Sequence, residues 1–360
     1  MASDFAACEQ PSHGGGGFGP PGRGGRLPLG WSIALMAIAA TGLYLALPRL
    51  AGLHDAWGRL SSGDPVLLGA AALLECASYG AYVWTFHRLF ACPGSRIGWK
   101  ESYDISLAGA AASRVFAAAG AGGIALTVWA LDRSGMDRKL IVVRLTSFYV
   151  LLYALFMAAL IVVGVALRTG VLHGPAPFAL TVVPAVLGGV AIVAALVAAG
   201  LQPDRGQRVA ARLRGHERIA KWVGRADAAL ATLAAGVRGG LTLARRRDPA
   251  LVGALLWWAL DIAVLWVCFA AFGEAPAGGV VVMGYLTGTL GNVVPVPGGV
   301  EGAMIGAFVA FGVDPGLAVA AVLGYRAFEY WLPIVPGVLA YVRLLHTVRE
   351  WDEGEITQSM

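Results

Sequence analysis

Three arginines lie inside long apolar segments of this 360-residue chain, at Arg114, Arg144 and Arg326. Arg326 comes about ten residues into its segment, which at ~1.5 Å of rise per helical residue is near the middle of a membrane. Placing an arginine against lipid at this depth costs roughly 2.5–3.5 kcal/mol of insertion free energy. We therefore expect Arg326 to face the protein interior, where it is paired or lines a polar cavity.

Carboxylates that can pair with Arg326 lie nearby in sequence or in other apolar segments. Glu329 follows within one helical turn, and Glu301 and Asp261 are the other candidates. One interpretation is a structural ion pair that locks helices together. The other is a binding site, in which Arg326, Glu301 and Glu329 contact a substrate.

The remaining arginines are placed less centrally. Arg144 lies close enough to the start of its segment for its side chain to reach the cytoplasmic interface. Arg114 follows Ser113 near the middle of a broken segment, where it could point into a cavity. We include both arginines, together with Tyr325, among the candidate substrate-binding residues.

A helix break at Pro297, Gly298 and Gly299 adds a second kind of binding group. The half-helix that follows would present unpaired backbone N–H groups and the positive end of its dipole, which bind anions such as phosphate. Glu301, in the first turn, would occupy part of that field and can exchange partners when a ligand arrives. Asn292, before the break, is either a hydrogen-bonding wall residue or a helix cap.

Motifs of common enzymes are absent from the sequence, including HExxH, the P-loop and GxSxG. The four cysteines form no CxxC pair and have no histidine at ligand spacing. We therefore expect no enzyme activity, no catalytic residues, no metal and no cofactor.

The elements that must position these residues are long apolar segments. The composition is 58% hydrophobic and 14% charged, with a mean hydropathy of +0.69, which is outside the range of soluble domains. Most apolar runs are about as long as a bilayer is thick, so lipid is the expected solvent. The runs span residues 31–47, 65–86, 103–131, 140–167, 178–201, 251–272, 280–311 and 317–345.

Two of these runs are interrupted, by glycines at 120–123 and by the Pro-Gly-Gly break at 295–299. Helical hydrogen bonding stops at such points, and each half is too short to span a bilayer. We predict an all-α, polytopic membrane protein with six crossing helices and two re-entrant helical hairpins, whose backbone must be covered by protein or a water-filled cavity.

The distribution of Lys and Arg predicts the orientation. With the N-terminus inside, three of the 27 Lys and Arg residues fall outside the cell, three fall within apolar runs, and the other 21 are cytoplasmic. This bias predicts a protein of the cell membrane with both termini in the cytoplasm. The expected domains are a disordered Gly/Pro-rich tail (1–28), a transmembrane domain (29–347) and a short tail (348–360).

The contexts of the two broken runs resemble each other. Gly135-Met136-Asp137 follows the first break and Gly312-Val313-Asp314 the second, each ahead of an intramembrane arginine. Each copy would be a crossing helix, a hairpin and another crossing helix, in opposite orientations. Such inverted repeats are common in transporters, with the binding site where the breaks meet. Chance similarity in an Ala/Gly-rich chain is the alternative.

A basic stretch between the apolar runs, residues 201–248, carries eleven Lys and Arg residues. Its charged and apolar positions separate at helical spacing, which favours an interfacial helix on anionic lipid. The charges can equally serve to fix topology. Without aromatic interleaving or a folded basic domain, nucleic-acid binding is not expected.

The Pro-x-Pro-Gly-Gly at 295–299, the following Glu301, the Tyr-Arg pair at 325–326 and the Trp-Leu-Pro run at 331–333 resemble the lysylphosphatidylglycerol synthase transmembrane-region family, also called flippase-like or UPF0104. The resemblance covers residues 29–347. It implies a polytopic helical fold associated with moving phospholipids or lipid-linked molecules between leaflets.

Two departures from the family are evident. Relatives often have a longer glycine spacer before the glutamate. The chain also ends shortly after its last apolar run, so the soluble aminoacyl-transferase domain of true synthases is not expected, nor is lipid aminoacylation by this chain.

Together these features predict a lipid flippase or lipid transporter, with a headgroup cavity formed by Arg326, Glu301, Arg114 and the Pro-Gly-Gly break. The expected partner is a membrane phospholipid with an anionic headgroup, and a second copy of this chain, in a homo-oligomer, is a further candidate partner. The alternatives are a secondary transporter of a small anionic solute and a non-transporting scaffold whose basic loop recruits a partner.

Overall fold

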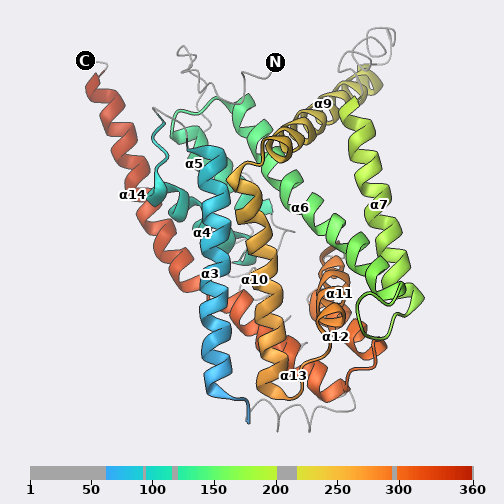
Figure 1. The fold of residues 1–360 in the computed structure, drawn as a ribbon. Coiled ribbons are helices and arrows are strands. Elements are labelled where there is room, and N and C mark those ends of the chain that lie inside the picture. Colours follow the sequence, from blue (N-terminus) through green and yellow to red (C-terminus); the bar gives the residue numbers. More distant parts are fainter. Residues whose placement is uncertain (1–61, 92–94, 116–120, 201–216, 294–297, 359–360) are drawn as a thin grey trace.

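The fold, seen in a computed structural model, is a bundle of helices (Figure 1). The structure describes residues 62–91, 95–115, 121–200, 217–293 and 298–358, and the regular elements in these ranges are all helices. This confirms the predicted all-α, polytopic class. The first predicted crossing segment, residues 31–47, and the tail 1–28 lie outside the described residues.

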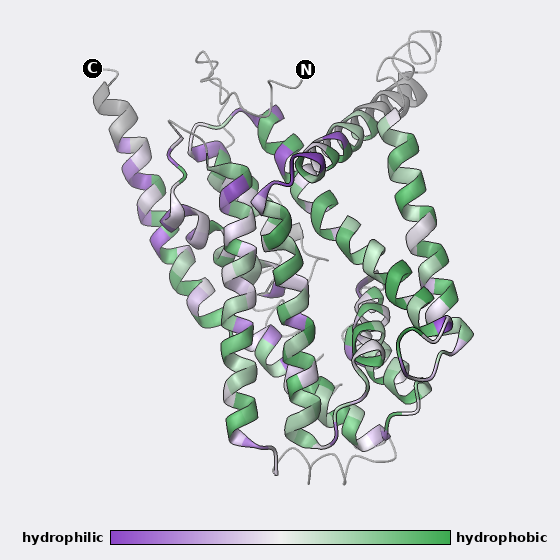
Figure 2. Cartoon of the chain, in the orientation of Figure 1, coloured by the Kyte–Doolittle hydropathy of each residue, from purple (hydrophilic) through white to green (hydrophobic). Residues whose placement is uncertain are grey.

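Within the residues that the structure describes, five helical stretches are long and apolar enough to cross a membrane. The outer faces carry exposed Val and Leu side chains, most densely on α7, whereas polar residues gather at the ends and inside the bundle (Figure 2). A soluble fold would bury these side chains. The chain is therefore a multi-pass membrane protein, with the spans α3 (Pro65–Phe90), α6 (Arg138–Arg168), α7 (Phe178–Gly200), α10 (Pro249–Phe272) and α13 to α14 (Pro315–Trp351).

Three of these spans begin with the same Asp-Pro pair. The aspartate caps the helix by accepting a hydrogen bond from a first-turn backbone N–H, and proline at the first position has no N–H to leave unpaired. The cap distances are 2.8, 2.9 and 2.9 Å for Asp64 in α3, Asp248 in α10 and Asp314 in α13. Local sequence thus determines where these helices start.

Two pairs of short helices pack inside the bundle as helical hairpins. The first is α4 (Trp99–Val115) with α5 (Ala121–Arg133), and the second is α11 (Gly278–Thr289), a 3₁₀ turn η2 (Leu290–Val293) and α12 (Gly299–Ala310). Residues 116–120 and 294–297, between the arms, lie outside the described residues. The prediction of a break at 120–123 is wrong for Ala121, Gly122 and Gly123, which form the first turn of α5, while Gly120 lies outside the described residues.

Glycines allow the arms of each hairpin to approach closely. A Cβ atom on Gly123 would lie 2.3 Å from the carbonyl oxygen of Gly109 across the first hairpin, and one on Gly291 would lie 2.6 Å from that of Gly299 across the second. Both distances are below any van der Waals contact. The glycines that weaken an isolated helix are therefore what lets these hairpins close.

The order of elements repeats. A long helix, a hairpin and a second long helix occur as α3, α4–α5, α6 and again as α10, α11–α12, α13–α14. Helices α3 and α10 lie side by side and run in opposite directions (Figure 1). The first hairpin packs on α14 and the second on α6, so each hairpin contacts the last helix of the other half.

The two similar Gly-x-Asp sequences fold into the same turn. Gly135 and Gly312 both have φ of +85°, and the residue after each donates its N–H to a carbonyl five residues back. This is the geometry in which glycine ends one helix while the following aspartate, Asp137 or Asp314, caps the next. The similarity noted in the sequence is thus a similarity of local structure.

Helix α9 and the C-terminal end of α14 complete the bundle. In the basic stretch, α9 (Glu217–Arg246) packs on α6 and α7, with Val237 buried and Leu230 exposed. The side chains of residues 217–228 lie outside the description. Helix α14 (Ile334–Gln358) continues through most of the predicted C-terminal tail.

The hydrophobic core consists of two clusters. One centres on α10 to α13 and the other on α3, α4, α6 and α14. Along α3, the buried polar residues Glu75 and Ser78 separate Ala71 of the first cluster from Phe86 of the second. A polar layer therefore lies between the two cores, and it leads to the site.

Candidate functional site

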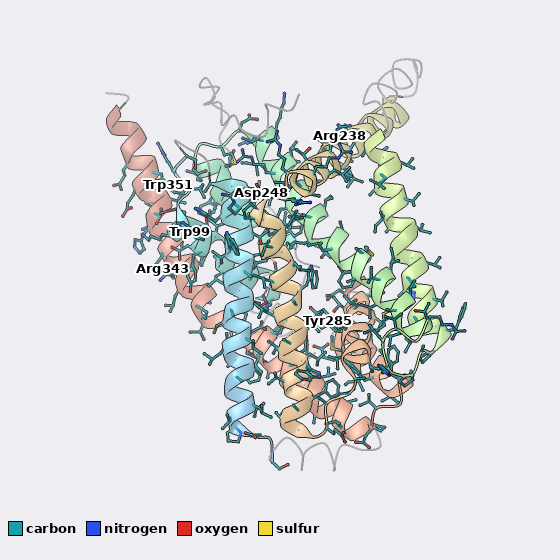
Figure 3. The ribbon with its side chains drawn as sticks, viewed as in Figure 1. Trp99, Arg238, Asp248, Tyr285, Arg343 and Trp351 are labelled. Carbon is teal, nitrogen blue, oxygen red and sulfur yellow. The ribbon has the colours of Figure 1, made fainter. Side chains whose placement is uncertain are left out.

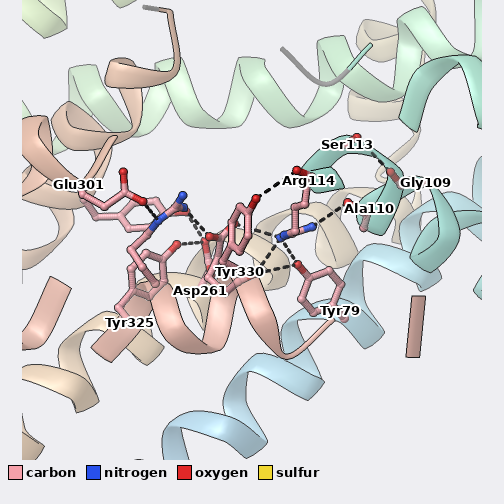
Figure 4. Close-up of polar contacts among 12 residues, drawn as sticks. Tyr79, Gly109, Ala110, Ser113, Arg114, Asp261, Glu301, Tyr325 and Tyr330 are labelled. Carbon is pink, nitrogen blue, oxygen red and sulfur yellow. Dashed lines mark hydrogen bonds and ion pairs between the residues drawn. The ribbon is translucent and has the colours of Figure 1, made fainter. Parts of the chain in front are cut away.

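A chain of alternating charges runs through this polar layer (Figure 4). The guanidinium of Arg114 lies 3.1 Å from Oε1 of Glu329, whose other oxygen lies 2.5 Å from Arg326. Arg326 in turn donates its Nε–H to Oε1 of Glu301 at 2.8 Å. Each arginine is thus held by at least one carboxylate, and Glu329 is shared by both.

This chain of alternating charges connects the tips of the two hairpins. Arg114 is in the last turn of α4, at the tip of the first hairpin, and Glu301 is in the first turn of α12, at the tip of the second. Arg326 and Glu329 lie where α13 ends, between these tips. The site is therefore built from residues that flank the two breaks, together with the end of α13.

A local irregularity orients the central pair. After Arg326 the chain forms a π-helical turn, Ala327–Trp331, an arrangement frequently found at functional sites. Pro333 follows and has no N–H to donate to the carbonyl four residues earlier, which belongs to Glu329. That carbonyl instead accepts hydrogen bonds from Arg114 at 2.8 Å and from the Tyr79 hydroxyl at 3.4 Å.

Packing of α4 against helix α14 also fixes the position of Arg114 along the length of the bundle. Two polar contacts about two helical turns apart fix α4 along this helix. Arg96, just before α4, donates to the Trp351 carbonyl, and Asp104 of α4 pairs with Arg343 at 2.7 Å. Figure 3 labels Arg343 and Trp351 on α14 and Trp99 at the start of α4, and the guanidinium carbon of Arg343 lies 5.5 Å from the ring centre of Tyr103 in α4. Since α4 and α14 run antiparallel, the end of α4 is brought to the start of α14, beside Glu329.

Two tyrosines surround the guanidinium groups. The Tyr79 hydroxyl is hydrogen-bonded to Arg114, whose guanidinium carbon lies 5.8 Å from the centre of the Tyr79 ring. Tyr330 lies between the two arginines, with its ring centre 6.0 Å from Arg114 and 5.8 Å from Arg326. Its hydroxyl donates to the Arg114 carbonyl at 3.1 Å. Both arginines are thus kept in place by contacts besides the ion pairs.

A carboxyl pair lies one layer behind the arginines. Asp261, in the middle of α10, accepts hydrogen bonds from the hydroxyls of Tyr285 and Tyr325, the latter at 3.0 Å. The carboxyl of Glu75, in the middle of α3, is hydrogen-bonded to that of Asp261. Because both acids lie near the midpoints of spanning helices, the site is at mid-depth of the bundle.

The site is only partly closed. The side chains of Arg114, Glu301, Arg326 and Glu329 keep 14 to 22% of their surface exposed. A small cavity of about 40 Å³ lies beside Ser113, the residue before Arg114, and its mixed polar and apolar lining from the first hairpin, α3 and α6 includes Ser106, Tyr82, Tyr149 and Phe148. This volume has room for water. Chemically, the arrangement can exchange a carboxylate on either guanidinium for an external anion.

Several sequence-predicted residues join this site. Arg326 contacts Glu301 and Glu329 as expected, and Arg114 reaches the same network. Gly298 takes a left-handed φ of +80° before α12, and it provides no side-chain cap for the N–H groups of that helix. Gly299 opens the helix, and Pro297 lies outside the described residues.

Other predicted residues lie apart from the ion-pair chain. Tyr325 binds Asp261, and Asn292 is exposed in η2. Arg144 does not reach the interface, because it is 3% exposed and donates to the Leu89 carbonyl near the end of α3 at 3.0 Å. Its position at the seventh residue of α6 places it inside the packed end of the bundle.

Sequence reasoning missed Glu75, Tyr79, Tyr285 and Tyr330. For Glu75 a signal was present, since it is a lone acid at the centre of the apolar run 65–86, where intramembrane charges are usually functional. The tyrosines carry no such signal, because they occur on apolar faces as well as in polar sites. Their roles follow only from the packing of α3, α11 and the π-turn.

Comparison with known proteins agrees with this architecture. A family model described as the lysylphosphatidylglycerol synthase TM region matches residues 30–337. The chain is also similar to a UPF0104 membrane protein of Methanothermobacter thermautotrophicus, with 33% identity over 89 residues. That match covers 24% of this chain and 25% of the relative, so the chain spans about a quarter of the curated relative it matches. On the strength of the family model, which covers most of the chain, this protein belongs to the lysylphosphatidylglycerol synthase transmembrane-region family.

Proposed function

We propose that this protein moves a phospholipid or lipid-linked molecule with an anionic headgroup between membrane leaflets. The observation that carries the proposal is the pair of arginines, Arg114 and Arg326, joined by one carboxylate at mid-depth of an apolar bundle. A phosphate oxyanion suits two guanidinium groups, which bind it through charge-assisted hydrogen bonds.

In the proposed mechanism the headgroup phosphate replaces Glu329 between the two arginines. Each guanidinium then exchanges one anionic partner for another, so neither is left unpaired in a low-dielectric site. Displacement of the Glu329 carboxylate removes one of the two contacts that this residue makes with Arg114, while its carbonyl continues to hold Arg114 and Glu301 continues to hold Arg326. The headgroup therefore binds between guanidinium groups that keep their positions.

Three features support a lipid in preference to a soluble anion. The bundle has extensive apolar outer faces, the charged chain retains exposed surface, and the family name refers to a lipid synthase. A headgroup at mid-depth with acyl chains in the bilayer needs a lateral opening between helices. An aqueous path alone would suffice for a small solute.

We also propose that the repeated order of elements is an inverted repeat with two re-entrant hairpins, located in the cell membrane with both termini cytoplasmic. The opposite directions of α3 and α10 support this arrangement. Transporters built this way alternate access by moving one half against the other around a central site. The hairpin tips at Arg114 and Glu301 are that centre.

The test is reconstitution of purified protein in liposomes that contain a fluorescent anionic phospholipid, with dithionite quenching of the outer leaflet. Wild type should exceed the quenching of empty liposomes, whereas Arg114→Gln and Arg326→Gln should not. Arg138→Gln serves as the control, because its ion pair with Asp132 is exposed and lies at the start of α6. It should move lipid at the wild-type rate.

A parallel assay measures efflux of trapped inorganic phosphate and glycerol 3-phosphate. Efflux without lipid movement would favour the solute transporter. If wild type moves neither lipid nor solute, with or without a proton gradient, a non-transporting scaffold becomes the better description. Normal lipid movement by folded Arg326→Gln would remove this arginine from the mechanism while leaving transport in place.

A further inference from the structure

The carboxyl of Glu75 is buried without full hydrogen bonding. Its side chain is 1% exposed, and Oε2 has no hydrogen-bond partner among the described residues. The side chain points into the layer behind the arginines, where it is hydrogen-bonded to Asp261. A buried polar atom without a partner is rare in native proteins and calls for a functional or structural reason.

Two carboxyl groups can be hydrogen-bonded to each other only if at least one carries a proton. Asp261 already accepts two tyrosine hydroxyls, so it is suited to be the ionised acceptor and Glu75 the protonated donor. An ionised Glu75 would leave a charged oxygen unpaired in the interior, whereas a protonated Glu75 leaves only a neutral carbonyl. The geometry therefore fits a resident proton on Glu75.

The charges that face this pair come from every neighbouring element. Arg114 of α4, Arg326 of α13 and Glu329 of the π-turn act on it directly or through the tyrosines, and Glu301 of α12 pairs with Arg326. The other titratable groups, Tyr79 of α3, Cys268 of α10, Tyr285 of α11 and Tyr325 of α13, are neutral when protonated. With one proton on the carboxyl pair, three carboxylates face two guanidinium groups, and the cluster carries one excess negative charge.

An anionic headgroup that enters this cluster meets unfavourable electrostatics. One more proton on the carboxyl pair neutralises the excess charge before a phosphate monoanion binds. Protonation and headgroup binding therefore favour each other, because each reduces the electrostatic cost of the other.

We propose that Glu75 and Asp261 form a proton-binding site that takes up one proton when the anionic headgroup binds at Arg114 and Arg326. The proton comes from the water on the side where the headgroup enters and returns to water on the side where it leaves. One proton thus accompanies each headgroup, and a proton gradient can drive the movement. This inference rests on the proposed function, since it assigns the energy coupling of the same site.

The resident proton is tested without any transport assay, by infrared spectroscopy of purified protein in lipid at neutral pH. Wild type should show the carbonyl band of a buried carboxylic acid, shifted by ¹³C-glutamate labelling and absent in Glu75→Gln. Asp104→Asn is the control, because this buried acid is paired with Arg343, and the band should persist. A wild-type spectrum without the band, or a band insensitive to ¹³C-glutamate, would overturn the assignment.

Coupling is tested by the pH dependence of phosphatidylglycerol binding to the protein in nanodiscs made of a zwitterionic lipid. Linkage of one proton predicts that affinity falls about tenfold per pH unit once the exchangeable proton is lost. The double variant Glu75→Gln/Asp261→Asn, locked in the neutral form, should bind without pH dependence at the wild-type low-pH affinity. If it fails to fold, Glu75→Asp, which keeps a titratable pair, should retain the wild-type slope.

The liposome assay separates the two proposals. Lipid movement that responds to an imposed proton gradient in wild type but not in the double variant supports the coupling. Lipid movement equally fast with and without the gradient, in wild type, would overturn the coupling and leave the flippase intact. Absence of lipid movement in every condition would overturn the proposed function, and a pH-independent phosphatidylglycerol affinity would overturn the coupling separately.

Discussion

Arg114 and Glu329 are 215 positions apart in the chain, yet their side chains meet at 3.1 Å. Arg114 ends the first arm of one hairpin, and Glu329 lies in the π-turn between α13 and α14. The backbone carbonyl of Glu329 binds the same guanidinium at 2.8 Å. One residue therefore holds Arg114 twice, once through a charge that a ligand can replace and once through a carbonyl that it cannot.

Glu329→Gln removes the charge shared by both arginines while keeping the shape of the side chain. We expect a loss of roughly 2–3 kcal/mol in the free energy of unfolding, somewhat below the cost of breaking a fully buried pair, because the side chains are partly exposed. Thermal unfolding in detergent measures it. Asp132→Asn, in an exposed pair with Arg138, should lose less than about 1 kcal/mol, and equal losses would show that Glu329 is an ordinary surface partner.

Gly291→Ala should prevent the second hairpin from closing. The added Cβ would lie 2.6 Å from the carbonyl oxygen of Gly299, a backbone atom that cannot move aside without displacing α12. We expect lower thermal stability and loss of lipid movement. Gly302→Ala is the matched control in the same hairpin, because nothing lies within 4 Å of its Cβ and alanine favours a helix by about 1 kcal/mol. A Gly302→Ala variant less stable than Gly291→Ala would contradict the close-packed tip.

The proposed orientation is tested by cysteine labelling in a variant without its native cysteines. The loop after α6 and the helix α9 lie at opposite ends of the bundle (Figure 1). His173→Cys, in that loop, should react with an impermeant thiol reagent added to intact spheroplasts. Arg225→Cys, in α9, should react only after permeabilisation, and its labelling from outside would invert the topology.

Much of the fold is predictable from the chain because the bilayer reduces the choice of structures. Apolar runs near 20 residues that cross a bilayer are expected to be helices, because a helix pairs all of its backbone groups internally. Glycine clusters alone do not locate the interruptions, since Gly188 and Gly189 lie inside the unbroken helix α7. The pairing of Arg326 with Glu301 and Glu329 was also predictable, since an arginine at mid-depth needs carboxylates and these were the nearest along the chain. Local chemistry and the solvent determine these features together.

The rest of the site depends on contacts between distant segments. Arg114 and Arg144 look alike in sequence, but the antiparallel packing of α4 on α14 brings Arg114 to Glu329, while Arg144 is placed against the end of α3. Glu75 gains its role only from the side-by-side packing of α3 and α10, which brings it to Asp261. No local pattern specifies which helices become neighbours.

Pro333→Ala tests whether the Glu329 carbonyl, which Pro333 leaves without a donor four residues later, positions Arg114. The substitution restores an N–H that can donate to this carbonyl, so it competes with the hydrogen bond from Arg114 at 2.8 Å. Helix continuity should improve and thermal stability should not fall. A hydrogen bond to a charged group contributes about 1.5 kcal/mol, so we expect lipid movement about tenfold slower than wild type.

Pro336→Ala is the control. It removes a proline from α14 whose carbonyl four residues earlier belongs to Leu332, and it should move lipid at the wild-type rate. Equal rates of lipid movement for Pro333→Ala and Pro336→Ala would show that Glu329 holds Arg114 through its carboxylate alone. A headgroup would then need to replace only that ion pair.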